Sequence, residues 1–462
     1  MTASPRNVGL NMKSHFSRSS RRGFIKKSAL FAGAAAGAKW IGAPAILSAA
    51  SPNSQLGIAV IACGGMGGGN PEVGARERLI ALVDVDDKKL AEAVKKVDAK
   101  APDAKKYFDY RKMFDECHKD IDVVLIATPD HHHAPAAMRA IQMGKHAFVQ
   151  KPLAHNIWEV RALTKAAREH KVQTQMGNQG HSGEGYRKLC EYIWAGAIGN
   201  VKETHSLMQR SFGGTGGRLP GKPIPEGVHW DEWLGPASDR EYHDGLHPFG
   251  WRSWMEFGTG TLGDMGCHLL DGTFWALKLA QAKKFTIECT QQKGGSEEMF
   301  PQDNIIKWEF PARGEMPPVK IFAHDNKWPD FVKELEKEHQ EKFDGGTLYV
   351  GEKGYMFTGT YGDKPRIIPK SKHDEFPVPA NTIPRSKHGV MGDFIDACKG
   401  GSPASSNFDV SGPFTEFVLT GVLASRAGTG KKIDWDVTNI KCTNLPEVNK
   451  WVKRTYRKGW EV

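Results

Sequence analysis

Residues 56–69 read Leu56-Gly57-Ile58-Ala59-Val60-Ile61-Ala62-Cys63-Gly64-Gly65-Met66-Gly67-Gly68-Gly69 and decide the fold. The apolar, partly β-branched run at 56–62 is typical of a buried parallel strand, and it leads directly into a glycine-rich turn. A second apolar run at 79–83 ends on Asp84, seventeen residues past Gly67. Strand, glycine-rich turn, helix, strand and acid in this order are the fingerprint of a dinucleotide-binding domain.

The glycine-rich turn also predicts how the dinucleotide is held. Glycines allow the backbone to approach a pyrophosphate, which sits at the N-terminus of the following helix. The first glycine place of the fingerprint is taken by Ala62. Asp84 can accept hydrogen bonds from ribose hydroxyls and would repel a 2′-phosphate, so we expect NAD rather than NADP. The turn residues predicted to contact the cofactor are Ala62, Gly64, Gly65, Met66 and Gly67.

Two further apolar runs, at 122–127 and 145–149, are expected to extend the parallel sheet. The first runs into a loop at Thr128-Pro129 and the second delivers Gln150-Lys151-Pro152. Loops at the carboxyl ends of parallel strands line the ligand crevice, so Thr128, Pro129 and Lys151 are candidate cofactor contacts. A helix is expected from about residue 135 to residue 143.

Three consecutive histidines, His131, His132 and His133, lie between the strand expected at 122–127 and the helix expected from about residue 135. Adjacent residues do not share a face, and no carboxylate or cysteine stands at ligand spacing, so we expect no metal site. We interpret the three as polar loop residues beside the cofactor, with His133 as a candidate cofactor contact.

Asp264 and His268 have the spacing i, i+4, so on a helix both side chains project from one face. A carboxylate beside an imidazole can orient the ring and raise its basicity. Considered alone, the pair also fits a helix-capping Asp and a core His. The glycine-rich run at 258–263 is expected to be a flexible approach to this helix.

With these motifs in place, the chain resembles the glucose–fructose oxidoreductase / inositol dehydrogenase / MocA (Gfo/Idh/MocA) family over nearly all of residues 55–462. The resemblance is carried by the glycine-rich turn with Asp84 and by the four stretches 127–129, 144–146, 151–152 and 263–268. The family's usual Glu-Lys-Pro is Gln150-Lys151-Pro152 in this chain.

The resemblance implies an α/β fold of two domains and a set of roles. Residues 55–178 would form an NAD-binding Rossmann domain with a doubly wound parallel sheet. Residues 179–462 would form an α+β domain with a large, open, mostly antiparallel sheet that binds substrate and packs against another subunit, giving a dimer or tetramer. His268 would take the hydroxyl proton, Lys151 would bind the reacting oxygen, and Asp264 would orient the substrate and couple to Lys151.

Residues on either side of the catalytic motif are candidates for the substrate pocket. Trp251 and Arg252 fit a sugar site, because indole faces stack on sugar rings and Arg binds hydroxyls or carboxylates; core packing is the alternative. Trp230 and Trp233 are expected to be core residues. His181 could reach the substrate or cap a turn.

Towards the C-terminal part of the sequence, helices are expected at 391–398 and 414–427, and a short strand is expected at 432–435.

The N-terminal stretch Ser20-Arg21-Arg22-Gly23-Phe24-Ile25-Lys26 fits the twin-arginine export pattern. An Ala/Gly-rich run and small-residue cleavage sites follow, with cleavage expected near residues 45–50, so residues 1–50 are interpreted as a signal peptide. This predicts transport by the twin-arginine translocase to the periplasm, with the cofactor already bound. Because no free dinucleotide pool is expected there, the NAD should be tightly held.

Charge and cysteine content exclude several other classes of protein. The 462 residues carry a formal charge of +10, but eight of the 63 Lys and Arg lie in residues 1–50, which hold no Asp or Glu. The remainder has 55 basic against 53 acidic residues, which does not favour nucleic acid as a partner. The seven Cys are scattered without a CxxC pair, so we expect buried thiols rather than disulfides or a zinc site.

Three functions remain open at this level. The first is an NAD(P)-dependent oxidoreductase that transfers hydride between a sugar or cyclic polyol and the bound cofactor. The second is a redox-neutral, NAD-dependent enzyme that cleaves glycosides by oxidation and elimination. The third is an inactive, NAD-holding sugar-binding module, which the joint presence of Lys151, Asp264 and His268 disfavours.

Overall fold

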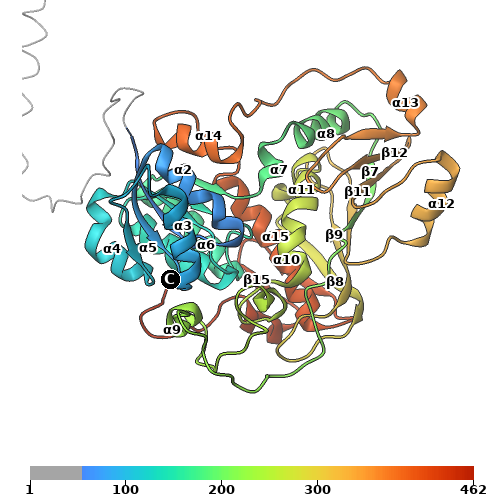
Figure 1. Cartoon of the computed structure of the whole chain (residues 1–462). Helices are drawn as coiled ribbons and strands as arrows, with labels where there is room; N and C mark the ends of the chain where they lie inside the picture. Colours follow the sequence, from blue (N-terminus) through green and yellow to red (C-terminus); the bar gives the residue numbers. More distant parts are fainter. Residues whose placement is uncertain (1–54) are drawn as a thin grey trace, which may run out of the picture. The chain divides into compact units, whose positions relative to one another are not determined.

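The computed structural model describes residues 55–462 (Figure 1). The predicted signal peptide at residues 1–50 lies outside the described residues. All seven cysteines are buried free thiols, as expected. Within residues 55–462, no helix combines the length and apolarity needed to cross a bilayer.

A six-stranded parallel sheet with the order β3-β2-β1-β4-β5-β6 forms the first part of the fold, which confirms the predicted Rossmann topology. Its central strand β1 is fully buried, because helices cover both faces of a parallel sheet. The strands are β1 (Gly57–Ile61), β2 (Arg78–Val83), β3 (Lys105–Tyr107), β4 (Val123–Ile126), β5 (His146–Val149) and β6 (Thr174–Met176).

The helices of this part follow the strands in alternation. Asn156 begins α6 with a capping box: its side chain accepts from the Glu159 backbone, and Glu159 reaches back to it. The elements are the 3-10 helices η1 (Gly65–Gly69) and η2 (His118–Asp120) and the helices α2 (Asn70–Arg76), α3 (Asp87–Val97), α4 (Tyr110–Cys117), α5 (Asp130–Gln142) and α6 (Ile157–His170).

A nine-stranded sheet with the order β13-β12-β11-β7-β10-β9-β8-β14-β15 forms the second part. Only the β7–β10 pair is parallel, so the predicted large, mostly antiparallel sheet is confirmed. Its strands are β7 (Val201–Leu207), β8 (Lys284–Lys293), β9 (Asp303–Phe310), β10 (Val319–His324), β11 (Gly346–Gly351), β12 (Tyr355–Thr358), β13 (Arg366–Ile368), β14 (Ile433–Asp436) and β15 (Lys441–Cys442).

Several helices of the second part lie beside this sheet, whereas α14 (Gly389–Cys398) lies beside the first part of the fold (Figure 1). The helices of this part are α7 (Gln179–Ser182), α8 (Glu184–Trp194), α9 (Trp230–Leu234), α10 (Gly260–Leu269), α11 (Asp271–Ala276), α12 (Asp330–His339), α13 (Lys370–Glu375), α14 (Gly389–Cys398) and α15 (Phe408–Ala427). Three 3-10 helices complete this part: η3 (Gly250–Ser253), η4 (Leu279–Gln281) and η5 (Pro446–Trp451).

Helix α15 joins the two parts of the fold. It contacts α6 on one side and β8 and β9 of the large sheet on the other. It is buried nearly all round, as an apolar helix inside a core should be. It begins at Phe408, six residues before the predicted start, because the Asn407 side chain caps it and Pro413 is accommodated within the helix.

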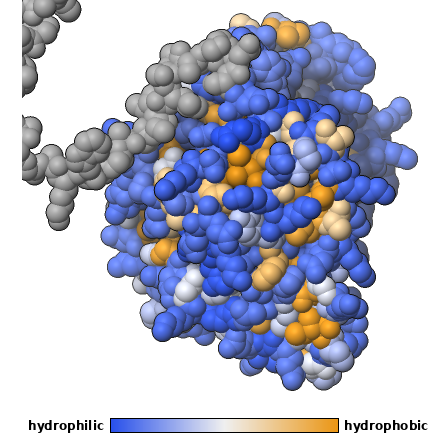
Figure 2. Space-filling view, turned by 60° about the vertical axis from the view of Figure 1, so that its left-hand side comes forward, coloured by the Kyte–Doolittle hydropathy of each residue, from blue (hydrophilic) through white to orange (hydrophobic). Residues whose placement is uncertain are grey.

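Helix α14 returns to the first sheet. Its Phe394, Ala397 and Cys398 belong to the same apolar cluster as Val60, Leu125 and Phe148. The C-terminal part of the chain therefore completes the cover of the Rossmann sheet. The face shown in Figure 2 is mainly hydrophilic and is interrupted by separate apolar groups, which is ordinary for a protein surface.

Candidate active site

The glycine-rich turn has the backbone shape that a dinucleotide needs. Ala62, in the first glycine place, adopts a left-handed φ of 69°, a conformation that glycine reaches without strain. A Cβ on Gly67 would collide with the Ala62 carbonyl oxygen, so only glycine fits there. Gly65 also has a positive φ of 52°, and a Cβ on it would meet no atom of residues 55–462 within 4 Å. The backbone there is open to a pyrophosphate.

Asp84 fixes this turn as well as facing the cofactor cavity. One carboxylate oxygen accepts from the Cys63 backbone N–H at 2.7 Å, and the other accepts from the Asp86 N–H at 3.0 Å. Burial raises the pKa of Asp84, against the two backbone hydrogen bonds that lower it. The acid therefore ties β2 to the turn after β1, and it stands where the ribose hydroxyls of NAD would lie.

A cavity of about 600 Å³ runs along the carboxyl ends of the parallel strands to α10. Most of the predicted site residues line it: Ala62, Gly64, Gly65, Met66, Asp84, Thr128, Pro129, Lys151, Trp251, Arg252, Asp264 and His268. The structure thus brings the predicted cofactor and catalytic residues to one site. Gly67, His133 and His181 are not among the lining residues.

Lys151 and Asp264 are in direct contact although they are 113 residues apart. The Lys151 ammonium donates to Asp264 Oδ1 at 2.7 Å and to the Asp264 carbonyl at 3.0 Å. Arg252 Nε approaches the same carboxylate oxygen at 3.4 Å. Burial would raise the pKa of Asp264, but Lys151 and Arg252 lower it, so the carboxylate stays charged.

His268 follows Asp264 by one turn of α10 and is 5% exposed. Burial and, to a smaller extent, the nearby Lys151 charge lower its pKa to about 3, although Asp264 acts in the opposite direction. The ring is therefore neutral at pH 7, and its buried Nδ1 has no hydrogen-bond partner among residues 55–462. The carboxylate of Asp264 bonds Lys151 and Arg252, with no hydrogen bond to His268. Tyr361 packs edge-on against the ring, with centroids 4.9 Å apart.

The three consecutive histidines form the first turn of α5, not a loop. The helix begins at Asp130, five residues before the predicted start, because Pro135 is accommodated inside it. His131 and His132 both contact the Trp233 carbonyl, at 3.0 and 2.8 Å. The ring nitrogens of His133 contact the carbonyls of Pro152 (2.7 Å) and Thr128 (2.9 Å).

Through these contacts the three histidines support the backbone around the cavity. All three are buried, and burial lowers the pKa of each, to about 3 for His132 and about 4 for His133. His133 joins the loop after β4 to the loop after β5, directly behind Lys151. It supports the cavity wall from behind and does not face the cavity.

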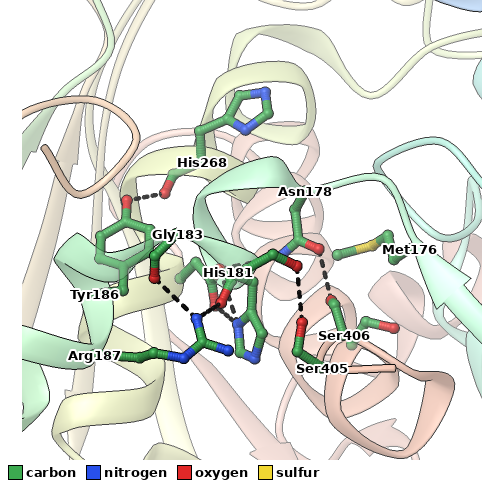
Figure 3. Close-up of polar contacts among 12 residues, drawn as sticks. Met176, Asn178, His181, Gly183, Tyr186, Arg187, His268, Ser405 and Ser406 are labelled. Atoms are coloured by element: carbon green, nitrogen blue, oxygen red, sulfur yellow. Dashed lines mark hydrogen bonds and ion pairs between the residues drawn. The ribbon is translucent and has the colours of Figure 1, made fainter. Parts of the chain in front are cut away.

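His181 lies in a different polar cluster (Figure 3). Its Nδ1 contacts the Asp271 carboxylate at 2.9 Å, and its ring stacks on Trp275 with centroids 4.4 Å apart. Asn178 donates to the same carboxylate at 3.0 Å. The cluster lines a second cavity of about 420 Å³ beside α11 and the start of α15. Tyr186 links it to the catalytic helix by donating to the His268 carbonyl.

The predicted core tryptophans are confirmed as core residues. Trp230 and Trp233 are buried and stack with centroids 4.5 Å apart. Trp233 also lines the cavity. Trp251 is buried as well, and its ring packs 4.2 Å from the Arg252 guanidinium, so it serves both core and cavity.

Asp130 is a site residue that the sequence reasoning missed. It lines the cavity, is 5% exposed, and accepts a hydrogen bond from Thr259 at 2.6 Å. Burial raises its pKa to about 7, against Thr259, Lys151 and Arg252, which lower it. The sequence did offer a signal for Asp130. The residue directly follows Thr128-Pro129, between the end of a strand and the start of a helix, where ligand-binding residues of a parallel sheet lie.

The position of the segment 227–249, which we call the strap, also escaped sequence reasoning, which had assigned only Trp230 and Trp233 of it to the core. It lies against the turn between β2 and α3: His247 contacts Asp86 at 3.1 Å, and His229 contacts Asp87 at 2.9 Å. The His229 ring stacks on Phe108 with centroids 3.9 Å apart. The strap thus covers the end of the cavity nearest Asp84, where the adenosine half of a dinucleotide belongs.

Fold and site together are those of a Rossmann-type, dinucleotide-binding protein. Residues 56–178 match the family described as "Oxidoreductase family, NAD-binding Rossmann fold", and residues 204–304 match its "C-terminal alpha/beta domain". These two regions are similar to the Gfo/Idh/MocA oxidoreductase family, as the sequence motifs predicted. NAD is the cofactor of the matched domain.

Two curated relatives are similar over shorter stretches. A levoglucosan dehydrogenase of Pseudarthrobacter phenanthrenivorans is 29% identical over 164 residues, 35% of this chain and 34% of the relative. Glycosyl hydrolase family 109 protein 2 of Shewanella sp. is 38% identical over 95 residues, 20% of each chain. The chain thus spans about a third or less of the length of these relatives.

A solved structure of similar fold is the WlbA dehydrogenase of Chromobacterium violaceum, in complex with NADH and UDP-GlcNAcA. Its TM-score is 0.56 at 15% identity, over 83% of this chain and 96% of that chain. This likeness supports the arrangement of the two sheets.

Asp130→Asn should remove a pH-dependent cost of folding. A carboxyl whose pKa is raised in the folded state holds its proton longer than in the unfolded state. The wild type should therefore lose stability as pH rises from about 4 to about 7, and stay at the lower level above that. The isosteric amide can still accept from Thr259, so the variant should gain about 1–3 kcal/mol relative to the wild type between pH 4 and pH 8.

Urea unfolding at several pH values measures this difference. Asp409→Asn is the matched control, because Asp409 also lies in the first turn of a helix but is exposed. Its effect should stay within about 0.5 kcal/mol. Parallel pH curves for the wild type and Asp130→Asn would contradict the assignment.

Proposed function

We propose that the protein is an NAD-dependent oxidoreductase that transfers hydride between the CH–OH group of a sugar or cyclic polyol and the cofactor. The observation that carries this proposal is the Lys151–Asp264 contact beside the buried, neutral His268, at the end of the cofactor cavity. Oxidation of a hydroxyl needs a donor that stabilises the reacting oxygen and a neutral base that accepts its proton, and a carboxylate can hold the donor in place.

The side chains divide the proton chemistry between them. The bound nicotinamide supplies a hydride acceptor. Lys151 donates to the reacting oxygen and stabilises negative charge as the proton leaves. His268, neutral before reaction, is placed to accept that proton. Asp264 fixes the Lys151 ammonium, and His133 contacts the carbonyls of Thr128 and Pro152 in the loops after β4 and β5, which supports the loop that carries Lys151.

Lys151→Ala and His268→Ala should each lower turnover by roughly 10²–10⁴-fold, the usual effect of losing an acid–base group. Cofactor binding should persist, because Asp84 and the glycine-rich turn are untouched. Lys165→Ala is the control, since that side chain is 75% exposed on α6. Turnover of a sugar panel and NADH fluorescence measure the two properties, and near-normal turnover of either active-site variant would remove that residue from the mechanism.

A second candidate is redox-neutral cleavage of a glycoside, favoured by the similarity to the Shewanella glycosyl hydrolase family 109 protein. Oxidation at one ring carbon acidifies the neighbouring C–H, and loss of that proton expels the leaving group from the next carbon. Water then adds to that carbon of the resulting enone, and the hydride is returned to the ketone at the end. In this reaction too, His268 would act as the base and Lys151 would bind the reacting oxygen. Cleavage of an aryl glycoside without net NADH formation distinguishes this function from the first.

We further propose that NAD remains bound through turnover. The strap supports this, because its two His–Asp contacts and the stack on Phe108 close the adenosine end of the cavity. Purified enzyme should retain NAD(H) through dialysis, and one sugar should reduce it in a single burst without added NAD.

The double variant His229→Ala/His247→Ala should release the cofactor about tenfold faster, since two partly exposed His–Asp hydrogen bonds and the stack on Phe108 are lost. His388→Ala, which removes an exposed His–Asp pair on α14, is the control. Stopped-flow displacement of NADH gives the rates. Steady release of NADH by the wild type, with an ordinary micromolar-to-millimolar KM for NAD, would show a dissociating dehydrogenase instead.

We also propose that the protein is exported to the periplasm by the twin-arginine translocase. Substitution of Arg21 and Arg22 tests this proposal. Replacing both with Lys should leave the protein in the cytoplasm, because the translocase recognises the guanidinium pair. Fractionation of cells that express either form measures this. Unchanged periplasmic recovery would rule out this route.

A further inference from the structure

Near helix α10 the cavity is lined by three cationic side chains, Lys151, Arg210 and Arg252, and by two carboxylates, Asp130 and Asp264. Lys89 and three further carboxylates, those of Asp84, Asp109 and Glu232, also line the cavity. The Asp264 carboxylate already forms ion pairs with both Lys151 and Arg252. Asp130 accepts a hydrogen bond from Thr259, and burial raises its pKa to about 7, so it carries only about half of its negative charge at pH 7.

Arg210 is the cation without a counter-ion. It is exposed, and its side chain makes no ion pair or hydrogen bond with any of residues 55–462. Its backbone is nevertheless held on both sides. The Arg210 N–H donates to the Asp325 carbonyl, and two residues later the Phe212 N–H donates to Thr261 Oγ1 on the catalytic helix α10.

The backbone before Arg210 is also unusual. Gln209 adopts a left-handed φ of 52°, directly after β7 ends at Leu207 and Met208 bonds the His324 carbonyl. A non-glycine residue in this conformation is strained and is common at binding sites. The turn brings Arg210 to the cavity lining, where a straight continuation of β7 would carry it along the sheet.

Arg252 approaches from the other side of the same region and is rigidly held. Its guanidinium lies 4.2 Å from the ring centroids of both Phe249 and Trp251. Nε faces Asp264, and Nη1 donates to the Phe249 carbonyl at 3.2 Å. A guanidinium fixed between two rings loses little entropy when it binds a planar anion.

We propose that the substrate is an acidic sugar, a uronic acid or uronoside, whose carboxylate binds Arg210, with Arg252 beside it. The inference rests on the proposed function and specifies its substrate class. The aromatic side chains of Phe249, Trp251 and Tyr361 around the cavity offer apolar surfaces to the C–H faces of the ring. The hydroxyl to be oxidised lies at Lys151, and the carboxylate lies toward Arg210.

Matched ligand pairs test this on the NADH-loaded enzyme, where binding is measured without turnover. Methyl glycopyranosiduronates and the corresponding methyl glycopyranosides, in gluco, galacto and manno configuration, differ only at C6. Isothermal titration should show at least one uronate binding about tenfold or more tighter than its neutral partner, the scale of a charge-assisted hydrogen bond. The difference should shrink at high ionic strength.

Variants then assign the effect to Arg210. Arg210→Ala should abolish the preference for the uronate and leave the neutral glycoside and NADH unaffected, and Arg210→Lys should restore part of it. Arg76→Ala, an exposed Arg at the end of α2, is the matched control and should change nothing. Equal binding of all acidic and neutral pairs, or absence of uronate binding, would overturn the proposal, as would a sugar 6-phosphate binding tighter than the uronate.

The same measurements separate the substrate class from the activity. Reduction of bound NAD by neutral sugars, with no preference for uronates, would leave the proposed oxidoreductase in place and remove the acidic substrate. Arg210-dependent uronate binding, with no cofactor reduction by any sugar and no glycoside cleavage, would keep the acidic site and remove the proposed function.

Discussion

The contact between Lys151 and Asp264 is the constraint on which the site depends. It joins the loop after β5 of the parallel sheet to helix α10 of the second part of the fold. Both side chains are largely buried, at 9% and 18% exposed. A buried ion pair costs desolvation that its attraction only partly returns, so stability is a poor reason for its presence. Its position at a cavity is consistent with the proposed role in proton transfer.

Burial has opposite consequences for the other titratable groups of the site. It raises the pKa of Asp130 and lowers that of His268, and in both cases it favours the neutral form. The charges that remain at the catalytic end are those of Lys151, Asp264 and the two arginines. The low-polarity wall behind them, including the histidines of α5, strengthens their action on a substrate.

Some of the site was predictable because it is encoded locally. The strand, the glycine-rich turn and Asp84 follow one another in the chain, and even Ala62 keeps the left-handed backbone that the first glycine place requires. Asp264 and His268 share one face of a helix by spacing alone. Other residues were placed differently, because adjacent sequence does not say which element a side chain meets. The ring of His133 contacts two carbonyls behind the cavity, and His181 belongs to the cluster around Asp271.

The sequence by itself determined the class of fold, the cofactor turn and the identity of the groups that could do proton chemistry. The tertiary structure alone decided that Lys151 touches Asp264, that Asp130 is desolvated, and that the strap reaches the turn after Asp84. The physical reason is the range of the forces involved. Hydrophobic periodicity and turn stereochemistry act between near neighbours in the chain, whereas desolvation and ion pairing depend on which distant segments share a cavity.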